Sequence, residues 1–459
     1  MMFSRVLVAN RGEIAVRVIR ALHELGVEAV AVYSTADRDS LHVRLADRAI
    51  CIGPPAAADS YLHIPSVIAA AETTGCEAVH PGYGFLSENP NFVRACGDTD
   101  LVFVGPSADV MERMGDKARA KAELGAADVP LVPGTEGGAA LADVRVAAGE
   151  LGYPVLLKAV AGGGGKGMRL VAAPDEFDAA FSTARSEAEA AFGDGTLYLE
   201  KALVPARHVE IQVLCDRLGG VLTLGERECS IQRRHQKLIE ESPSPALDAA
   251  TREAMEAASE RACRAIGYEG AGTFEFLLGD DGAFHFIELN ARLQVEHPVS
   301  ELVTGIDVVR EQLRIASGET LPATGRAPRR GHALEIRLNA EDPARDFAPA
   351  PGRITRFRPP LGPGVRVDTY LEEGSSISPY YDSLVAKLIV GAEDRGATIA
   401  RGVRALEELE LEGVPTTRGL ALDILRSEEF ASGVYSTSFL DEMDERLPAL
   451  RAAPMGAAP

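Results

Sequence analysis

The stretch from residue 272 to residue 298, G-T-F-E-F-L-L-G-D-D-G-A-F-H-F-I-E-L-N-A-R-L-Q-V-E-H-P, decides how the chain is interpreted. Two β-rich runs flank an Asp-Gly pair, which predicts a β-hairpin. With Asp281-Gly282 as the loop, Glu275 lies directly opposite Glu288, and any loop that differs by two residues keeps both on one face. Opposed side chains lie ~5 Å apart, so two ionised carboxylates repel by roughly 3 kcal/mol at an effective dielectric near 20.

Something must offset this repulsion, and the hairpin alone leaves three alternatives open. The carboxylates could share one proton, or bind a hard divalent cation together with Asn290, which lies on the same face. They could also lie on a solvated sheet face. Arg292, Gln294 and Glu296 continue the alternation beyond the strand and favour a site for phosphate and a small anion.

Composition limits the class of protein. The 459 residues suggest two to four domains, and a hydrophobic content of 46% can fill their cores. Lys and Arg (47) minus Asp and Glu (68) give a net charge of −21, which argues against binding to nucleic acid or an anionic membrane. The six cysteines have no metal-site spacing and predict reduced thiols in a cytoplasmic protein. Neither an export signal nor a membrane span is expected.

The first 115 residues predict a Rossmann-like domain. A buried-type strand at residues 5–11, a helix that ends at Gly26 and a second strand form a parallel unit. Its first turn lacks G-x-G-x-x-G, so dinucleotide binding there is not expected. The later loop H-P-G-Y-G-F-L-S-E-N (80–89) follows a strand, where open α/β sheets place ligands, although a tight turn is the alternative.

A glycine-rich stretch, A-G-G-G-G-K-G (161–167), is the second informative signal. A strand precedes it and another follows it, which excludes the Rossmann interpretation of its formal G-x-G-x-x-G match. A Walker A loop is excluded because the residue after Lys166 is glycine and not Ser or Thr. The pattern favours a mobile hairpin lid whose amides cover phosphates, with Lys158 at its base, over a plain surface hairpin.

The remaining sequence predicts more strands and helices and one further boundary. Q-R-R-H-Q-K (232–237) ends a strand in a dense polar cluster, and residues 248–266 form an amphipathic helix closed by Gly267. A polar, Pro- and Arg-bearing linker places a domain boundary near residue 330. The Ala/Pro-rich segment 447–459 is expected to be a flexible tail.

With these pieces in order, residues 3 to about 445 resemble the biotin carboxylase family of the ATP-grasp superfamily. The motifs that carry the resemblance are A-N-R-G-E-I-A (9–15), H-P-G-Y-G-F-L-S-E-N (80–89), M-G-D-K (114–117), K-A-V-A-G-G-G-G-K-G-M-R (158–169), Q-R-R-H-Q-K (232–237), N-A-R-L-Q-V-E-H-P (290–298) and R-L-N-A-E-D-P (337–343). The resemblance implies a multidomain α/β and α+β protein. Its parts would be a Rossmann-like domain (1–115), an ATP-grasp domain (116–330) with a glycine-rich lid (about 131–204) and a mixed C-terminal domain (331–446).

The resemblance also implies an activity and a site. ATP would phosphorylate bicarbonate to carboxyphosphate, with Mg²⁺ or Mn²⁺ as cofactor, and the carboxyl would pass to biotin on a carrier protein. The implied ATP-binding residues are Lys117, Lys158, Gly162, Gly163, Gly164, Gly165, Glu200, Lys201, Leu203, His208, Gln232, His235, Leu277, Glu275 and Glu288. The implied metal ligands are Glu275, Glu288 and Asn290; bicarbonate would lie among Lys237, Arg292, Gln294, Val295 and Glu296; biotin would contact Tyr83 and Arg337. Lys237, Arg292, Glu296 and Arg337 would be catalytic.

The chain departs from the family pattern at Ala291, Glu228 and Ile336 and in a longer turn at residues 279–283. None of these removes a proposed catalytic group, but Glu228 could shift the neighbouring polar cluster. No lysine adjoins a methionine, so a biotin-bearing segment is not expected in this chain. The expected partners are therefore a separate biotin carboxyl carrier protein and a carboxyltransferase, in an acyl-CoA carboxylase such as the acetyl-CoA carboxylase of fatty acid biosynthesis. The resemblance also implies a homodimer. The alternatives are another ATP-grasp ligase with a different acceptor and a nucleotide-binding scaffold without activity.

Overall fold

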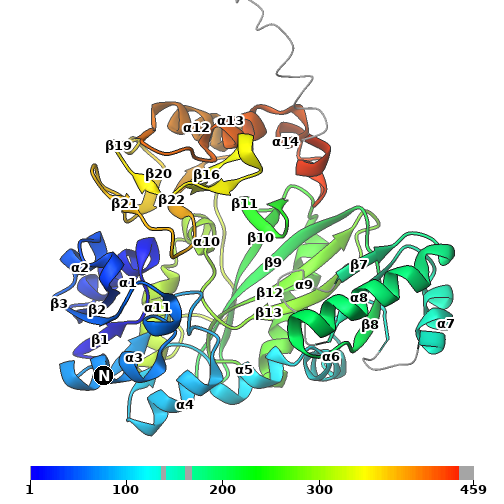
Figure 1. Cartoon of the computed structure of the whole chain (residues 1–459), viewed down its shortest axis with the longest axis horizontal. Helices are drawn as coiled ribbons and strands as arrows, with labels where there is room; N and C mark the ends of the chain where they lie inside the picture. The colour runs from blue at the N-terminus through cyan, green and yellow to red at the C-terminus, as the bar shows by residue number, and fades with distance from the viewer. Residues whose placement is uncertain (1, 136–140, 161–167, 444–459) are drawn as a thin grey trace, which may run out of the picture.

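The structure, a computed structural model, describes residues 2–135, 141–160 and 168–443. A large twisted sheet crosses the middle of the molecule, with the N-terminal region, a smaller sheet and the C-terminal region around it (Figure 1). The predicted glycine loop (Gly162, Gly163, Gly164 and Gly165) and the predicted tail (447–459) lie outside the described residues.

The N-terminal region confirms the predicted parallel α/β unit. Its sheet has the order β3-β2-β1-β4-β5, and each of its described pairings is parallel. Asn10, just after β1, donates from Nδ2 to the carbonyls of Pro81 and Tyr83, each at 2.7 Å. The two motifs at residues 9–15 and 80–89 therefore meet at one edge of the sheet, where the carboxyl ends of β1 and β4 lie together. The elements are β1 (Arg5–Val8), α1 (Gly12–Glu24), β2 (Glu28–Ser34), α2 (Leu41–Leu45), β3 (Arg48–Gly53), α3 (Ile64–Thr74), β4 (Ala78–His80), α4 (Pro90–Asp98), β5 (Val102–Phe103) and α5 (Ala108–Gly115).

A separate antiparallel sheet, β7-β6-β8, follows and is called the lid sheet below. One face packs its apolar side chains against α7 and α8, with Leu157 and Leu199 fully buried. Because side chains alternate across a strand, Lys158 and Glu200 lie on the other face. The elements are α6 (Lys117–Ala126), α7 (Leu141–Leu151), β6 (Val155–Ala159), β7 (Met168–Val171), α8 (Phe177–Phe192) and β8 (Leu197–Lys201).

The large sheet, called the central sheet below, has the order β13-β12-β9-β10-β11-β15-β22-β20, with β14 beside β10. Helix α9 begins as predicted, because the Asp248 side chain accepts from the Thr251 amide at 2.7 Å, and it ends at Gly267 in the left-handed conformation. The elements up to residue 330 are β9 (Ala206–Cys215), β10 (Val221–Arg233), β11 (Gln236–Ser242), α9 (Ala249–Ile266), β12 (Gly270–Gly279), β13 (Phe284–Asn290), α10 (His297–Thr304), α11 (Val308–Ala316) and β14 (Gly325–Arg326).

The C-terminal region extends the central sheet, because β15 pairs antiparallel with β11 and β22 pairs with β15. The hydrogen-bonded sheet therefore runs across the boundary expected near residue 330, and that boundary stays a prediction. The elements are β15 (His332–Asn339), β16 (Glu341–Asp342), β17 (Ala348–Pro349), β18 (Gly352–Arg353), β19 (Arg356–Arg358), β20 (Val365–Thr369), β21 (Ser376–Ile377), β22 (Leu384–Ala392), α12 (Arg395–Glu408), β23 (Glu410–Glu412), α13 (Arg418–Arg426) and α14 (Glu428–Ser432). Four 3₁₀ turns, Thr35–Asp37, Ala57–Asp59, Pro174–Glu176 and Pro343–Arg345, complete the described elements.

The β12–β13 hairpin confirms that Glu275 and Glu288 are directly opposed, although the loop differs from the predicted one. The Gly279 amide donates to the Ala283 carbonyl at 2.8 Å, so the loop between them holds three residues, 280–282, rather than two, and Gly282 has a φ of 79°. A loop that is longer by one residue would, by itself, have turned Glu288 to the other face of the sheet. A bulge in β13 places Ile287 outside the register and restores the pairing. Glu275, Glu288 and Asn290 therefore share one face.

Candidate active site

A cleft with a volume of about 1370 Å³ opens between the N-terminal region, the lid sheet, the central sheet and the C-terminal region. The predicted residues on its walls are Tyr83, Lys117, Lys158, Glu200, Leu203, His208, Gln232, His235, Lys237, Glu275, Leu277, Glu288, Asn290, Arg292, Gln294, Val295 and Arg337. Below, the part around Lys237, Arg292, Gln294, Glu296 and Arg337 is called the anion half. The part around Lys117, Lys158, Glu200, Leu203 and Leu277 is called the nucleotide half.

Among the predicted residues that the structure describes, two are not on the walls. Glu296 is fully buried just beneath them, where it bonds to the wall residues Lys237 and Arg337. Lys201 points elsewhere, because its Nζ donates to the carbonyl of Gly152 at 2.8 Å. Glu200 faces the cleft, so the next side chain along the strand faces away. A side-chain contact between Lys201 and ATP is thus not supported.

Lys237 lies at the centre of the anion half. From β11, its Nζ donates to Glu210 Oε2 at 2.6 Å, to Glu275 Oε1 at 2.9 Å and to Glu296 Oε1 at 2.6 Å. Burial opposes its charge, but the three carboxylates outweigh burial and raise the pKa of Lys237 well above its ordinary value. One ammonium does not neutralise three carboxylates, so further cations can offset the negative charge that remains.

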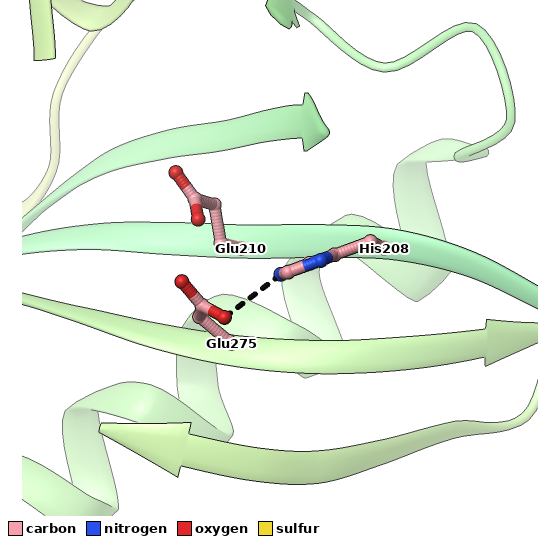
Figure 2. A group of neighbouring side chains, drawn as sticks. All are labelled: His208, Glu210 and Glu275. Carbon is pink, nitrogen blue, oxygen red and sulfur yellow. Dashed lines mark ion pairs between the residues drawn. The ribbon is translucent and has the colours of Figure 1, made fainter. Parts of the chain in front are cut away.

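His208 is the second ion-pair partner of Glu275, after Lys237. Figure 2 shows the His208 ring of β9 directed at Glu275 of β12, with Glu210 beside it. Nε2 of His208 lies 2.9 Å from Glu275 Oε2; burial opposes the charged ring, but Glu275 raises the pKa of His208 above its ordinary value. Glu210 was not predicted as a site residue, although the alternation H-V-E puts it on the face of His208.

Two sets of side chains among the described residues have the composition of metal sites: His208, Glu210 and Glu275, and Glu210, Cys229 and Glu296. The Lys237 ammonium already bonds to three of these carboxylates. Both sets are therefore better explained as parts of one ion-pair network.

The face shared by Glu275, Glu288 and Asn290 fits a hard divalent cation, because it offers two opposed carboxylates and an amide oxygen. The shared-proton alternative is disfavoured. Glu275 accepts hydrogen bonds from Lys237 and from Asn290 Nδ2 (2.8 Å). Burial opposes its charge, but Lys237 and His208 outweigh burial and hold the pKa of Glu275 well below the ordinary value. Desolvation and the charge of Glu275 raise the pKa of Glu288 above its ordinary value.

Arg292 is held in place by acceptors on three sides. Its Nε donates to Glu88 Oε2 at 2.8 Å, and its two terminal nitrogens donate to Asn290 Oδ1 at 3.0 Å and to Gln294 Oε1 at 3.2 Å. Glu88 also accepts from the amide of Ala291 at 2.9 Å. Glu88 lies in the motif at residues 80–89, but the sequence offered no signal for a partner some 200 positions away.

Arg337 bridges two buried glutamates. Its Nη2 donates to Glu296 Oε2 at 2.9 Å and its Nε to Glu240 Oε1 at 2.6 Å. Burial opposes the charge of Glu296, but Lys237 and Arg337 hold its pKa well below the ordinary value, so it is ionised. Burial raises the pKa of Glu240 to about 7, with Arg337 opposing and Glu296 adding to the rise. Glu240 was not predicted as a site residue.

The nucleotide half brings two lysines to one carboxylate. Lys158 of the lid sheet and Lys121 of α6 both pair with Glu200, and together they overcome burial and lower the pKa of that carboxyl. Desolvation lowers the pKa of Lys117, with Glu288 opposing. Lys121, whose ammonium also lies 4.7 Å from the centre of the Tyr198 ring, was not predicted.

The departures from the family pattern leave the cleft intact. Glu228 is buried and accepts from the hydroxyls of Ser230 and Ser244, the latter at 2.7 Å, and pairs with Arg207 at 3.4 Å. These partners satisfy it away from the cleft, so the expected shift of the polar cluster has no support. Ile336 is fully buried in the core of the C-terminal region.

None of the helices in the described part of the chain has the length and apolar character needed to span a membrane.

Comparison with known families covers nearly the whole chain. Residues 2–111 match the model "Biotin carboxylase, N-terminal domain", residues 116–324 match "Carbamoyl-phosphate synthase L chain, ATP binding domain", and residues 335–442 match "Biotin carboxylase C-terminal domain". The chain is 53% identical to biotin carboxylase of Nostoc sp. over 447 residues, which cover 97% of this chain and 100% of the relative. It is 50% identical to biotin carboxylase 1 of Bacillus subtilis, over 96% of this chain and 99% of the relative.

Solved structures agree with these matches. A Campylobacter jejuni biotin carboxylase, described as a β-γ-ATP complex, superposes with a TM-score of 0.92 at 47% identity, over 96% of this chain and 99% of that one. The biotin carboxylase domain dimer of Hydrogenobacter thermophilus 2-oxoglutarate carboxylase, with MgADP, ADP and bicarbonate, gives 0.91 at 46% identity, over 97% and 98%. The expected fold, a Rossmann-like region, an ATP-grasp region and a mixed C-terminal region, is confirmed. The chain belongs to the biotin carboxylase family of ATP-dependent ligases, which carboxylate biotin.

Proposed function

We propose that this chain uses ATP to activate bicarbonate as carboxyphosphate and transfers the carboxyl group to biotin on a carrier protein. One observation carries the proposal: three cationic side chains of the anion half, Lys237, Arg292 and Arg337, line one part of the cleft beside the ionised carboxylate of Glu296. Cations gather two like-charged reactants, and a carboxylate can accept the proton of bicarbonate.

Bicarbonate would lie among Lys237, Arg292, Gln294, the Val295 amide and Glu296. The Arg292 guanidinium is planar and prearranged by Glu88, which suits a planar anion. Glu296 begins as a weak base because Lys237 and Arg337 stabilise its charge. A bound bicarbonate competes for the same two cations, so it weakens their hold on Glu296 and makes that carboxylate a better proton acceptor.

ATP would lie along the nucleotide half. Lys117 and Lys158 would contact phosphates together with the glycine loop at residues 162–165. Glu200, Leu203 and Leu277 would meet the base, and His208, Gln232 and His235 the ribose side. Glu275, Glu288 and Asn290 would hold Mg²⁺ or Mn²⁺, which neutralises charge that develops on the transferred phosphate.

Biotin would enter beside Tyr83 and Arg337, which both line the cleft. The Tyr83 hydroxyl donates to Glu13, which fixes its ring at the wall. Arg337, shared between Glu240 and Glu296, presents a positive charge that stabilises the enolate form of the biotin ureido group.

The protein would act with a biotin carboxyl carrier protein and a carboxyltransferase, and as a homodimer like the Hydrogenobacter thermophilus domain. We also propose that it works as three domains with boundaries near residues 115 and 330. A cytoplasmic location agrees with its six free cysteines.

The direct test is release of ADP by the purified chain with ATP, Mg²⁺, bicarbonate and free biotin. We expect ADP release that requires bicarbonate and is stimulated by biotin. Turnover that ignores biotin but responds to another amine or carboxylate acceptor would support the alternative ATP-grasp ligase instead.

A further inference from the structure

The loop from residue 291 to residue 296 carries most of the anion half but contains no helix or strand. Irregular backbone can place a substrate only if its peptide groups are fixed by other contacts. Two successive carbonyls of this loop, those of Gln294 and Val295, each accept a hydrogen bond from a fully buried side chain.

The first of these side chains is His297, the opening residue of α10. Its Nδ1 lies 2.7 Å from the carbonyl oxygen of Gln294. A carbonyl only accepts, so Nδ1 must carry the proton. Burial, reinforced by the positive charges of Lys387, Arg17 and Arg366, holds the pKa of His297 well below its ordinary value, so the ring is neutral. A neutral ring with a proton on Nδ1 has none on Nε2.

The direction of the Gln294 carbonyl determines the direction of the Val295 N–H. In a trans peptide the C=O and the following N–H point in opposite directions, and the cis bonds among the described residues all precede proline. Because the Gln294 carbonyl points inward to His297, the Val295 N–H points the other way. Val295 itself lines the cleft.

The second side chain is Lys387 of β22, which is fully buried. Its Nζ donates to the Val295 carbonyl at 2.7 Å and pairs with Glu13 of α1 at 3.1 Å. This contact fixes the following peptide plane, from which Glu296 extends. Through Glu13 and Lys387, the N-terminal and C-terminal regions thus both help to hold the loop.

We propose that His297 is a positioning residue for bicarbonate: its Nδ1–H, at 2.7 Å, adds to the longer bond from its own backbone amide, at 3.3 Å, fixes the Gln294 carbonyl and thereby aims the Val295 N–H at the substrate. The inference rests on the proposed placement of bicarbonate at Val295. His297 touches neither substrate nor reacting atoms; it acts through one peptide plane.

Two substitutions separate this role from simple packing. In His297→Asn the side-chain amide nitrogen takes about the place of Nδ1, and in His297→Gln it takes about the place of Nε2. We expect His297→Gln to raise the KM for bicarbonate about tenfold or more, the effect of losing one hydrogen bond to a charged ligand. His297→Asn should stay within about threefold of the wild type, and the KM for ATP should stay within about twofold in both. Equal losses in the two variants, or a parallel rise in the KM for ATP, would overturn the proposal.

An NMR measurement tests the protonation of the His297 ring without an activity assay. In the full chain labelled with ¹⁵N-histidine, the signal that disappears in His297→Asn should show a protonated Nδ1 and an unprotonated Nε2. A proton on Nε2, or on both nitrogens, would refute the positioning role. If the wild type released no biotin-dependent ADP but showed the Nδ1–H tautomer, the proposed function would fail while the peptide contact stood.

Discussion

The two halves of the cleft are built differently. In the anion half, Lys237 and Arg337 project from β11 and β15, neighbouring strands of one hydrogen-bonded sheet, and the loop 291–296 follows directly after β13 of the same sheet. In the nucleotide half, Leu277 belongs to the central sheet, whereas Lys158 and Glu200 belong to the lid sheet. Strand spacing therefore sets the distance between Lys237 and Arg337 before any ligand binds, and the hydrogen bonds from His297 and Lys387 fix the loop. The nucleotide half depends on how two separate sheets are placed.

The two halves differ in how far their charges are arranged before a ligand binds. The anion half holds its ionised groups in mutual contact, so bicarbonate enters a prearranged set of charges. A ligand competes with a buried carboxylate in both halves, bicarbonate with Glu296 and a phosphate with Glu200. In the nucleotide half, however, the paired Lys158 and Glu200 belong to the separate lid sheet. Changes in the first half should therefore act on chemistry and on stability, and changes in the second on ATP affinity.

The largest expected effect is on the proton acceptor. Glu296→Gln keeps the size of the side chain but removes the charge that Lys237 and Arg337 stabilise. We expect kcat for biotin-dependent ADP release to fall by roughly 10²–10⁴, the usual contribution of a general base, while the KM for ATP changes by less than about threefold. Steady-state kinetics at saturating bicarbonate measure both. A kcat within about threefold of the wild type would exclude Glu296 as the base.

The second prediction concerns the buried ion pair between Arg227 and Glu210, which lies beneath Lys237 of the anion half. Arg227 is fully buried and bonds to Glu210, to Gln212 at 2.7 Å and to Thr273 at 3.0 Å. Arg227→Met leaves Glu210 with one cation fewer in the interior, so the free energy of unfolding should fall by about 3–5 kcal/mol. Urea unfolding measures this loss.

The matched control for Arg227 is a surface ion pair. Arg264 pairs with Glu260 at 2.7 Å one turn away on α9, and Arg264 is more than half exposed. Arg264→Met should change the free energy of unfolding by less than about 0.5 kcal/mol. Similar losses in the two variants would mean that the buried network does not stabilise the central sheet.

The third prediction addresses the nucleotide half. Lys158→Met removes a cation from the cleft face of the lid sheet, and we expect the KM for ATP to rise about 10–100-fold with little change in the KM for bicarbonate. Lys201→Met is the matched control, since that side chain lies on the other face of the same lid sheet and bonds to the carbonyl of Gly152. An equal effect of both substitutions would show that strand alternation does not sort the two lysines as described.

Much of this site could be predicted because alternation along a strand is local. The pairing of Glu275 with Glu288 followed from the hairpin pattern, although the three-residue loop and the bulge at Ile287 that restores the register depend on sheet twist and are not visible in the sequence. The same alternation, applied to β8, would have shown that Glu200 and Lys201 cannot both face the cleft.

Contacts between distant segments could not be predicted in this way. Glu88 meets Arg292, and Glu240 meets Arg337, only because separate elements converge. No periodicity or spacing in one sequence encodes such a meeting. His297 lies inside a recognised motif, but its role depends on the direction of a single carbonyl, which only coordinates reveal.

The smallest expected effect is the pH dependence that Glu240 gives to stability. Its pKa rises from an ordinary 4.5 to about 7 in the fold, first because of burial and then because Glu296 lies nearby, with Arg337 opposing. The folded state therefore holds a proton that the unfolded chain releases near pH 4.5. The stability that this bound proton gives to the folded state is fully present below pH 4.5 and is lost as pH rises through about 7.

Glu240→Gln imitates the protonated carboxyl at every pH, so it should abolish that loss. Relative to the wild type, the free energy of unfolding of the variant should increase by about 1–2 kcal/mol between pH 5 and pH 8, below the ceiling of about 3.4 kcal/mol that the pKa change allows. Urea unfolding of both proteins at the two pH values measures the difference, and Glu253→Gln on the exposed face of α9 serves as the control. If the difference in the free energy of unfolding between Glu240→Gln and the wild type does not change with pH, Glu240 is ionised at both pH values. Arg337 is then shared by two full negative charges.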